Sequence, residues 1–120
     1  MAHPKVVVYE YAKCSTCRKA LQFLDKKGIP YEKRPIVDQP PTRAELERML
    51  ARVGELKRLF NTSGELYREL KVSEKLKSMT QDQALELLSK HGKLVKRPFV
   101  LAGDEGLVGF DEARWSQVFK

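Results

Sequence analysis

Two cysteines, Cys14 and Cys17, are the residues of this chain whose type and spacing point most directly to chemistry. They are the only cysteines in 120 residues, and they form a Cys-X-X-Cys pair between the apolar run 5–9 and an amphipathic stretch. A helix N-terminus leaves backbone N–H groups unpaired and carries about half a positive charge, which favours a thiolate placed there. We therefore predict that Cys14 is an exposed nucleophile and that Cys17, one turn later, is the resolving thiol.

The residues alone leave two other roles open for this pair. A zinc site needs about four ligands, and besides the cysteines the chain offers only His3 and His91. We therefore expect no metal and no tightly bound cofactor. The second alternative is a pair of buried, inert cysteines. Cys17 lies on an apolar stripe and fits that role, whereas Cys14 precedes the stripe among polar residues.

The charge balance predicts anionic partners or substrates. Lys and Arg number 23 against 16 Asp and Glu, which gives a net charge of +7. The excess gathers around the cysteines, because segment 13–34 holds seven basic and two acidic residues. A Lys-rich, solvated helix face is the alternative interpretation of this segment. We expect no direct nucleic-acid binding, since the sequence has no aromatic platform or recognition motif for bases.

Length and composition predict a single domain over residues 1–120, with 42% hydrophobic and 32% charged residues, as in soluble globular proteins. No apolar run approaches membrane-spanning length, and the first residues lack the apolar stretch of a signal peptide. We therefore expect a cytoplasmic protein without a membrane partner. In a reducing compartment, a Cys-X-X-Cys pair serves redox chemistry more often than it forms a structural disulfide.

Hydrophobic periodicity predicts the elements that position the cysteines. A strand over 5–9, a helix over 15–27 and a strand over 31–37 form a βαβ unit whose two strands are parallel. A helical insertion follows at about 42–91. Its helical segments are predicted after the N-cap Thr42 and as far as Gly54, over 55–60, 65–70 and 73–79, and from the N-cap Thr80 to about 90.

The last third of the chain changes to a two-residue period. It is predicted to contain a strand, a tight turn, a second strand and a capped helix, at 99–101, 104–106, 107–110 and after Asp111. The predicted fold class is therefore α/β. It has a four-stranded mixed sheet with flanking helices, and the helical insertion lies between a βαβ half and a ββα half. The order of these two halves, with Cys-X-X-Cys after the first strand, resembles the thioredoxin arrangement.

Four segments together resemble the arsenate reductase/Spx family, over nearly the whole chain. They are Cys14-Ser15-Thr16-Cys17-Arg18-Lys19-Ala20, LFNTSGELY at 59–67, KRPFVL at 96–101 and LVGF at 107–110. The second cysteine is the pattern of the Spx-like branch. The resemblance implies a thioredoxin-like fold in which a cis Pro98 opens the third strand and faces the cysteine pair. The residues alone also allow a trans proline at a strand start.

The resemblance also assigns the candidate site. Arg97 matches the arginine that binds the oxyanion or lies beside the thiol in this family, so we predict that it is catalytic together with Cys14 and Cys17. The residues predicted to bind the substrate are Lys13, Ser15, Thr16, Arg18 and Pro98. For Arg97 a surface position is the alternative, and for the polar residues beside the nucleophile the alternative is simple solvation.

Arsenate itself is not the substrate that this sequence predicts. Arsenate reductases of the family surround the oxyanion with three arginines, and this chain keeps only Arg97. Asn61 and Phe110 fall where the other two would lie. A multiply charged oxyanion needs several cationic donors, and the sequence does not supply them at these positions.

Two functions follow from the resemblance. The first is a cytoplasmic thiol-disulfide reductase, in which Cys14 attacks an oxidised thiol or an anionic substrate and Cys17 resolves the product. Glutathione, or a thioredoxin or glutaredoxin, would restore the dithiol. The alternative is an Spx-like, redox-switched transcriptional regulator that binds the C-terminal domain of the RNA polymerase α subunit. A structural domain with incidental cysteines is a third interpretation.

Overall fold

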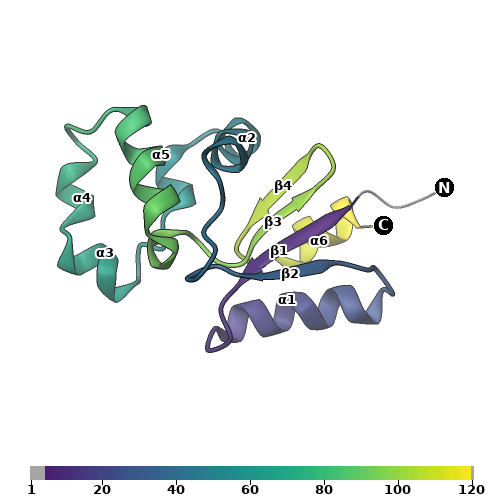
Figure 1. Cartoon of the computed structure of the whole chain (residues 1–120). Helices are drawn as coiled ribbons and strands as arrows, with labels where there is room; N and C mark the ends of the chain where they lie inside the picture. The colour runs from purple at the N-terminus through teal and green to yellow at the C-terminus, as the bar shows by residue number, and fades with distance from the viewer. Residues whose placement is uncertain (1–4, 120) are drawn as a thin grey trace.

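The computed structural model describes residues 5–119, which form a four-stranded sheet and its surrounding helices (Figure 1). The strand order is β2-β1-β3-β4, where the strands are β1 (Val6–Glu10), β2 (Glu32–Pro35), β3 (Phe99–Ala102) and β4 (Glu105–Val108). β1 runs parallel to β2 and antiparallel to β3, and β3 runs antiparallel to β4. The predicted mixed sheet with its parallel βαβ half is confirmed. His3 and the first residues, on which the expectation of no signal peptide rested, lie outside the described residues.

The helical segments form two groups, as Figure 1 shows. α1 (Ser15–Lys26) and α6 (Glu112–Val118) lie together along the sheet. The insertion between β2 and β3 holds α2 (Arg43–Val53), η1 (Leu56–Leu59), α3 (Glu65–Glu69), α4 (Val72–Lys75), α5 (Gln81–Lys90) and η2 (Gly92–Leu94). The predicted insertion is confirmed, although no pattern in the sequence indicated the short η2. Over residues 5–119, no helix combines the length and the apolar character that crossing a membrane requires.

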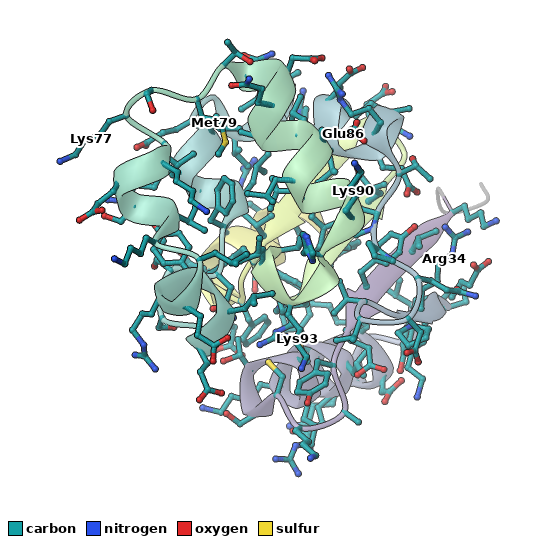
Figure 2. All side chains as sticks on the ribbon, turned by 60° about the vertical axis from the view of Figure 1, so that its left-hand side comes forward. Arg34, Lys77, Met79, Glu86, Lys90 and Lys93 are labelled. Carbon is teal, nitrogen blue, oxygen red and sulfur yellow. The ribbon has the colours of Figure 1, made fainter. Side chains whose placement is uncertain are left out.

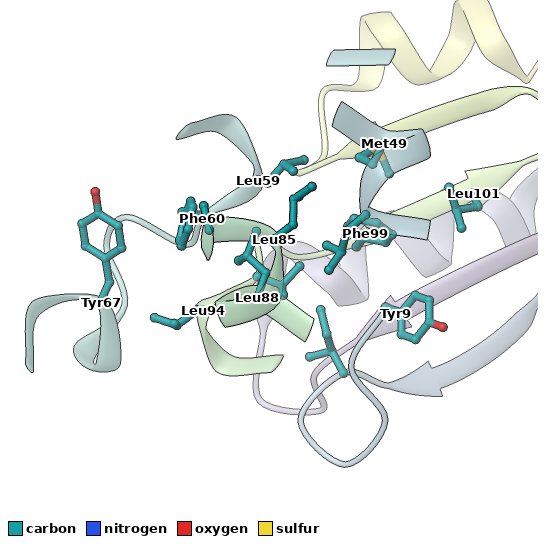
Figure 3. Close-up of a cluster of buried hydrophobic side chains, with 14 of the residues drawn as sticks. Tyr9, Met49, Leu59, Phe60, Tyr67, Leu85, Leu88, Leu94, Phe99 and Leu101 are labelled. Atoms are coloured by element: carbon teal, nitrogen blue, oxygen red, sulfur yellow. The ribbon is translucent and has the colours of Figure 1, made fainter. Parts of the chain in front are cut away.

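Strand β1 is buried on both of its faces, which explains its unbroken apolar sequence. Val6 and Val8 point into a cluster with α1 and α6 that includes Leu24 and Trp115. Val7 and Tyr9 point the other way. Figure 3 shows the second cluster, in which the sheet residues meet apolar side chains of the insertion, among them Met49, Leu85, Leu88 and Leu94. The insertion is therefore packed directly against the sheet.

The predicted hairpin turn at 104–106 is wrong by about two residues. Ala102 pairs with Glu105, so the turn consists of Gly103 and Asp104. Gly103, the first residue of this two-residue turn, has φ +61°, a backbone conformation that glycine adopts without strain. Gly106 lies inside β4 instead, where a Cβ atom would approach Met49 Sδ to 2.7 Å. The sequence attributed to a turn a glycine that instead packs against the Met49 side chain of α2.

The predicted helix starts at Thr42 and Thr80 are confirmed by the hydrogen bonds of their capping residues. Thr42 Oγ1 accepts a hydrogen bond from Glu45 N at 3.2 Å, and Glu45 Oε1 accepts one from Thr42 N at 2.9 Å. Thr80 and Gln83 make the same reciprocal pair at α5. Each pair satisfies backbone groups that a helix N-terminus otherwise leaves free.

A hydrogen-bonded chain of side chains links the sheet to the insertion. Tyr9 of β1 donates its hydroxyl proton to Glu45 Oε1 of α2 at 2.6 Å, and Arg34 Nη1 of β2 donates to the Tyr9 hydroxyl oxygen at 2.8 Å. Burial, followed by the hydrogen bond to Glu45, raises the pKa of Tyr9, which therefore stays protonated and keeps its donor at neutral pH.

Gly92 lies where the backbone of the insertion closely approaches the backbone after β2. A Cβ atom at this position would lie 1.7 Å from the carbonyl oxygen of Ile36, which follows β2. The obstacle is backbone, so it cannot rotate away as a side chain would. The sequence explains Gly92 as a helix end, whereas the structure requires it for this contact.

We predict that Gly92→Ala lowers the free energy of unfolding by about 3 kcal/mol or more, because overpacking here displaces a backbone segment. Gly54→Ala is the matched control. Gly54 has φ +78°, and no atom lies within 4 Å of the position that a Cβ atom would take. The added methyl group therefore makes no clash, and its cost is the strain of a left-handed backbone conformation, about 1 kcal/mol. Urea unfolding of both variants measures the difference. Equal losses would show that the contact with Ile36 does not limit position 92.

Candidate functional site

Cys14 is the N-cap residue of α1, at the end of the loop that leaves β1. The loop is closed by a hydrogen bond from Cys14 N to the Tyr11 carbonyl oxygen at 3.0 Å, and the helix begins with Arg18 N donating to the Cys14 carbonyl at 3.2 Å. Cys14 Sγ is half-exposed and accepts a hydrogen bond from Cys17 N at 3.3 Å. The sulfur thus lies where the free backbone N–H groups of the first turn gather, a position that suits a negatively charged atom.

Cys17 differs from Cys14 in its surroundings. It is fully buried, and both cysteines are free thiols. The pKa of Cys17 is raised to about 12, first by burial and then by the hydrogen bond with Cys14. A hydrogen bond involving the Tyr11 backbone and the charge of Arg97 act in the opposite direction on this pKa. Cys17 is therefore a protonated thiol at neutral pH, held directly behind the accessible sulfur of Cys14.

Arg97 and Pro98 lie beside the cysteine loop. The Arg97–Pro98 peptide bond is cis, as the family resemblance implies. The half-buried Arg97 guanidinium lies over the Tyr11 ring, with 4.7 Å from Cζ to the ring centroid. Pro98 is buried, and its carbonyl accepts a hydrogen bond from Gly109 N at 2.9 Å. Arg97 is thus held against the same loop that presents Cys14, and its charge reaches Cys17.

The four other predicted site residues lie around the start of α1. Lys13, Ser15 and Arg18 are exposed, and Thr16 is half-buried. Within residues 5–119, none of these side chains makes a hydrogen bond or ion pair with another side chain. They lie next to Cys14 in the chain and face solvent, so they are free to contact a molecule that approaches the nucleophile.

A pocket of about 280 Å³ opens where the insertion meets the cysteine loop. Tyr11 and Arg97 form its sheet-side wall. The insertion supplies the remaining lining residues, which are Asn61, Gly64, Glu65, Leu66, Glu69 and Lys93. Figure 2 shows Lys93 at the end of the insertion that lies toward the purple α1 segment. Sequence reasoning missed the charged insertion residues, because Glu65, Glu69 and Lys93 come to line one pocket with Tyr11 and Arg97 only through tertiary packing.

These features together define a thioredoxin-like protein: a Cys-X-X-Cys pair at the start of the first helix, a cis proline before β3, and the sheet order β2-β1-β3-β4. A family model described as the ArsC family matches residues 9–118. The chain belongs to the ArsC family, which confirms the family resemblance seen in the sequence.

Known relatives carry different names. The "Uncharacterized protein YusI" of Bacillus subtilis is 44% identical over 110 residues, covering 91% of this chain and 93% of that protein. The "Global transcriptional regulator Spx 2" of Oceanobacillus iheyensis is 33% identical, over 84% of this chain and 74% of that protein. A solved ArsC family related protein from Bacteroides fragilis is 42% identical, with a TM-score of 0.91 over 99% of this chain and 100% of the other.

The pKa of Cys17 predicts how stability depends on pH. The folded protein keeps this thiol protonated to about pH 12, whereas in the unfolded chain a free thiol ionises near about pH 8.5. The stabilising contribution is complete below the unfolded pKa and is lost as pH rises toward the folded pKa. We expect wild type to lose free energy of unfolding, relative to Cys17→Ala, between about pH 8.5 and 10. Urea unfolding under reducing conditions measures the difference in free energy of unfolding between wild type and Cys17→Ala. A difference that does not change with pH would contradict the raised pKa of Cys17.

Proposed function

We propose that this protein is a cytoplasmic thiol-disulfide oxidoreductase in which Cys14 is the nucleophile and Cys17 is the resolving thiol. The observation that carries the proposal is the contrast within the pair. One sulfur is accessible at the helix start, and the other is buried one turn behind it, with Cys14 Sγ 3.3 Å from Cys17 N. Exchange chemistry needs this division, because one sulfur must meet the substrate while the second waits for the intermediate.

In the first step, the Cys14 thiolate attacks one sulfur of a substrate disulfide R–S–S–R′. The new bond joins Cys14 to R–S, and R′–S⁻ leaves with the electron pair of the broken bond and takes up a proton from water. In the second step, Cys17 passes its proton to water and attacks Cys14 Sγ. R–S⁻ leaves, and the Cys14–Cys17 disulfide forms. Two electrons have then passed from the dithiol to the substrate.

The environment of Cys17 supports this order of steps. Two of the causes that raise its pKa are the hydrogen bond with Cys14 and the charge of Cys14, and both change when Cys14 Sγ is bonded to the substrate. Burial, the largest cause that raises this pKa, stays in place, and so do the two causes that lower it, the Tyr11 backbone and Arg97. Cys17 thus becomes easier to deprotonate once the mixed disulfide exists, which is when a resolving thiolate is needed.

Arg97 and the residues at the start of α1 have supporting roles in this proposal. Arg97 favours negative charge on the sulfurs and on the leaving thiolate, and Pro98 fixes its position beside the loop. Lys13, Ser15, Thr16 and Arg18 contact the substrate as it reaches Cys14. Glutathione, or a thioredoxin or glutaredoxin, reduces the Cys14–Cys17 disulfide and closes the cycle.

A disulfide substrate suits this site better than arsenate. Of the two positions where the family's other arginines fall, Asn61 lines the pocket without a charge. Phe110 packs its ring 5.0 Å from that of Trp115, in the cluster between α1 and α6, and so lies outside the pocket lining. A single arginine, Arg97, remains from that set, and it acts here on thiolate charge rather than as part of an oxyanion cage.

Substitution of the two cysteines tests the proposal. With bis(2-hydroxyethyl) disulfide as the substrate and glutathione as the reductant, Cys14→Ser should abolish turnover, because no mixed disulfide can form. In a separate reaction with the disulfide and without glutathione, Cys17→Ser should trap Cys14 in a mixed disulfide that mass spectrometry detects. Ser116→Ala, an exposed change on α6, is the control. Turnover by Cys14→Ser equal to wild type, or no turnover by wild type, would overturn the proposal.

Arg97→Ala should lower the rate of reaction of Cys14 with the same disulfide by about tenfold, which corresponds to about 1.4 kcal/mol of lost transition-state stabilisation. Arg97→Lys should recover part of the rate, because the charge is kept. Arg68→Ala is the control, since Arg68 is exposed on α3 and does not line the pocket. Stopped-flow measurement at pH 7 gives these rates, and an unchanged rate for Arg97→Ala would remove its assigned role.

The second candidate is a redox-switched regulator that binds the C-terminal domain of the RNA polymerase α subunit. It is supported by the relative named as a global transcriptional regulator, Spx 2. In this function the Cys14–Cys17 disulfide changes the affinity for the partner instead of turning over substrate. Association with that α-subunit domain that weakens with salt and changes on oxidation would favour the regulator over the reductase.

A further inference from the structure

We propose that the groove between α1 and α6 binds an acidic peptide segment of a protein partner. Carboxylates of the segment lie along Lys19, Lys26 and Lys27, and an apolar side chain of the segment rests on Phe23 and Phe110. The helices α1 and α6 pack on one face of β1 and the insertion packs on the other, so this groove is separate from the pocket beside Arg97.

One face of α1 forms most of the groove, which has a volume of about 520 Å³. The residues that α1 and its C-cap contribute include Lys19, Phe23, Lys26 and Lys27. Spacings of four, seven and eight residues bring side chains to the same side of a helix. The side that packs against the sheet is a different one and carries Leu24. The groove face of α1 is therefore left without a partner element.

The two acidic residues of segment 13–34 are both engaged with other groups. Glu32 pairs with Lys5 and with Arg34. Asp25 Oδ1 accepts a hydrogen bond from the Tyr31 hydroxyl at 2.9 Å. The basic excess of this segment is therefore not neutralised by its own carboxylates.

The lysines of the groove are available to an anion. Over residues 5–119, Lys19, Lys26 and Lys27 take part in no ion pair, and all three are exposed. Among the described lining residues, Glu112 of α6 sets a single negative charge against their three positive ones. The helix dipole favours Lys26 and Lys27 at the C-terminus of α1, whereas Lys19 lies in the N-terminal half and gains nothing from it. Charge complementarity thus points to an acidic ligand.

The floor of the groove is aromatic, which favours a peptide over a nucleic acid. Phe23 and Phe110 are half-buried, and their rings meet edge to face with 5.7 Å between centroids. Each ring also contacts Trp115, at 5.8 and 5.0 Å. The Lys27 ammonium lies 5.4 Å from the Phe23 centroid and covers one face of that ring. Bases need open ring faces on which to stack, whereas an aliphatic side chain packs on such a surface in any orientation.

A short segment is long enough to reach all of the lysines. Lys19 and Lys26 are seven residues apart, which is about 10 Å along the helix axis. An extended peptide covers that distance with about three or four residues. Glutamates or aspartates on both sides of an apolar residue therefore meet the lysines while the apolar side chain contacts the floor.

The test uses a fluorescein-labelled peptide in which glutamates flank two central leucines, and it measures binding by fluorescence anisotropy at about 0.15 M salt. Lys19→Gln combined with Lys26→Gln should weaken binding about fivefold. Lys75→Gln combined with Lys77→Gln removes the same charge from exposed positions of the insertion, and it should leave binding unchanged. Glutamine in place of the peptide's glutamates, or serine in place of its leucines, should also weaken binding to wild type.

No binding of the peptide by wild type would overturn the inference. So would equal weakening by the two double variants, because binding would then follow net charge and not this groove. An oligothymidylate that binds more tightly than the peptide, and that the Lys19 and Lys26 substitutions release, would make a nucleic acid the occupant instead.

Discussion

Burial of β1 on both of its faces is the constraint on which the rest of the structure depends. Its side chains alternate between the cluster under α1 and α6 and the cluster under the insertion, so one strand joins the two cores. A shift of register by one residue would exchange these two sets of side chains. Because β1 is held in this way, the loop after Glu10 leaves the sheet at a defined point and delivers Cys14 to the start of α1.

The insertion forms part of the candidate site because contacts between backbone groups hold it against the sheet half. Gly92 lies against the Ile36 carbonyl, and the Phe60–Val95 bridge ties the segment leading into α3 to the segment before Arg97. Contacts between backbone groups tolerate less movement than contacts between flexible side chains. The α3 carboxylates and the cysteine loop therefore keep a defined relative position, which a pocket shared between them requires.

The contrast between the surroundings of the two cysteines comes from burial more than from their spacing. Both belong to one helical turn, yet Cys14 is half-exposed, whereas Cys17 lies on the buried face of α1 with Ala20 and Leu24. The same burial that raises the pKa of Cys17 keeps it from reacting with passing oxidants. Arg97 offsets part of that effect, and so a single cation couples the reactivity of the pair to the pocket.

Signals within a few residues determined the βαβ half, the capping pairs of α2 and α5, and the candidates Cys14 and Cys17 directly from the sequence, because caps, apolar periods and short motifs act locally. Arg97 became a candidate only through the family resemblance. The turn at Gly103 was misplaced because Gly106 carries an equal local signal, and only packing against Met49 distinguishes them. Glu65, Glu69 and Lys93 could not be assigned to the pocket, since their nearness to Tyr11 depends on how the insertion closes over the sheet. That closure is decided by burial of distant apolar side chains, and no local pattern in the chain records it.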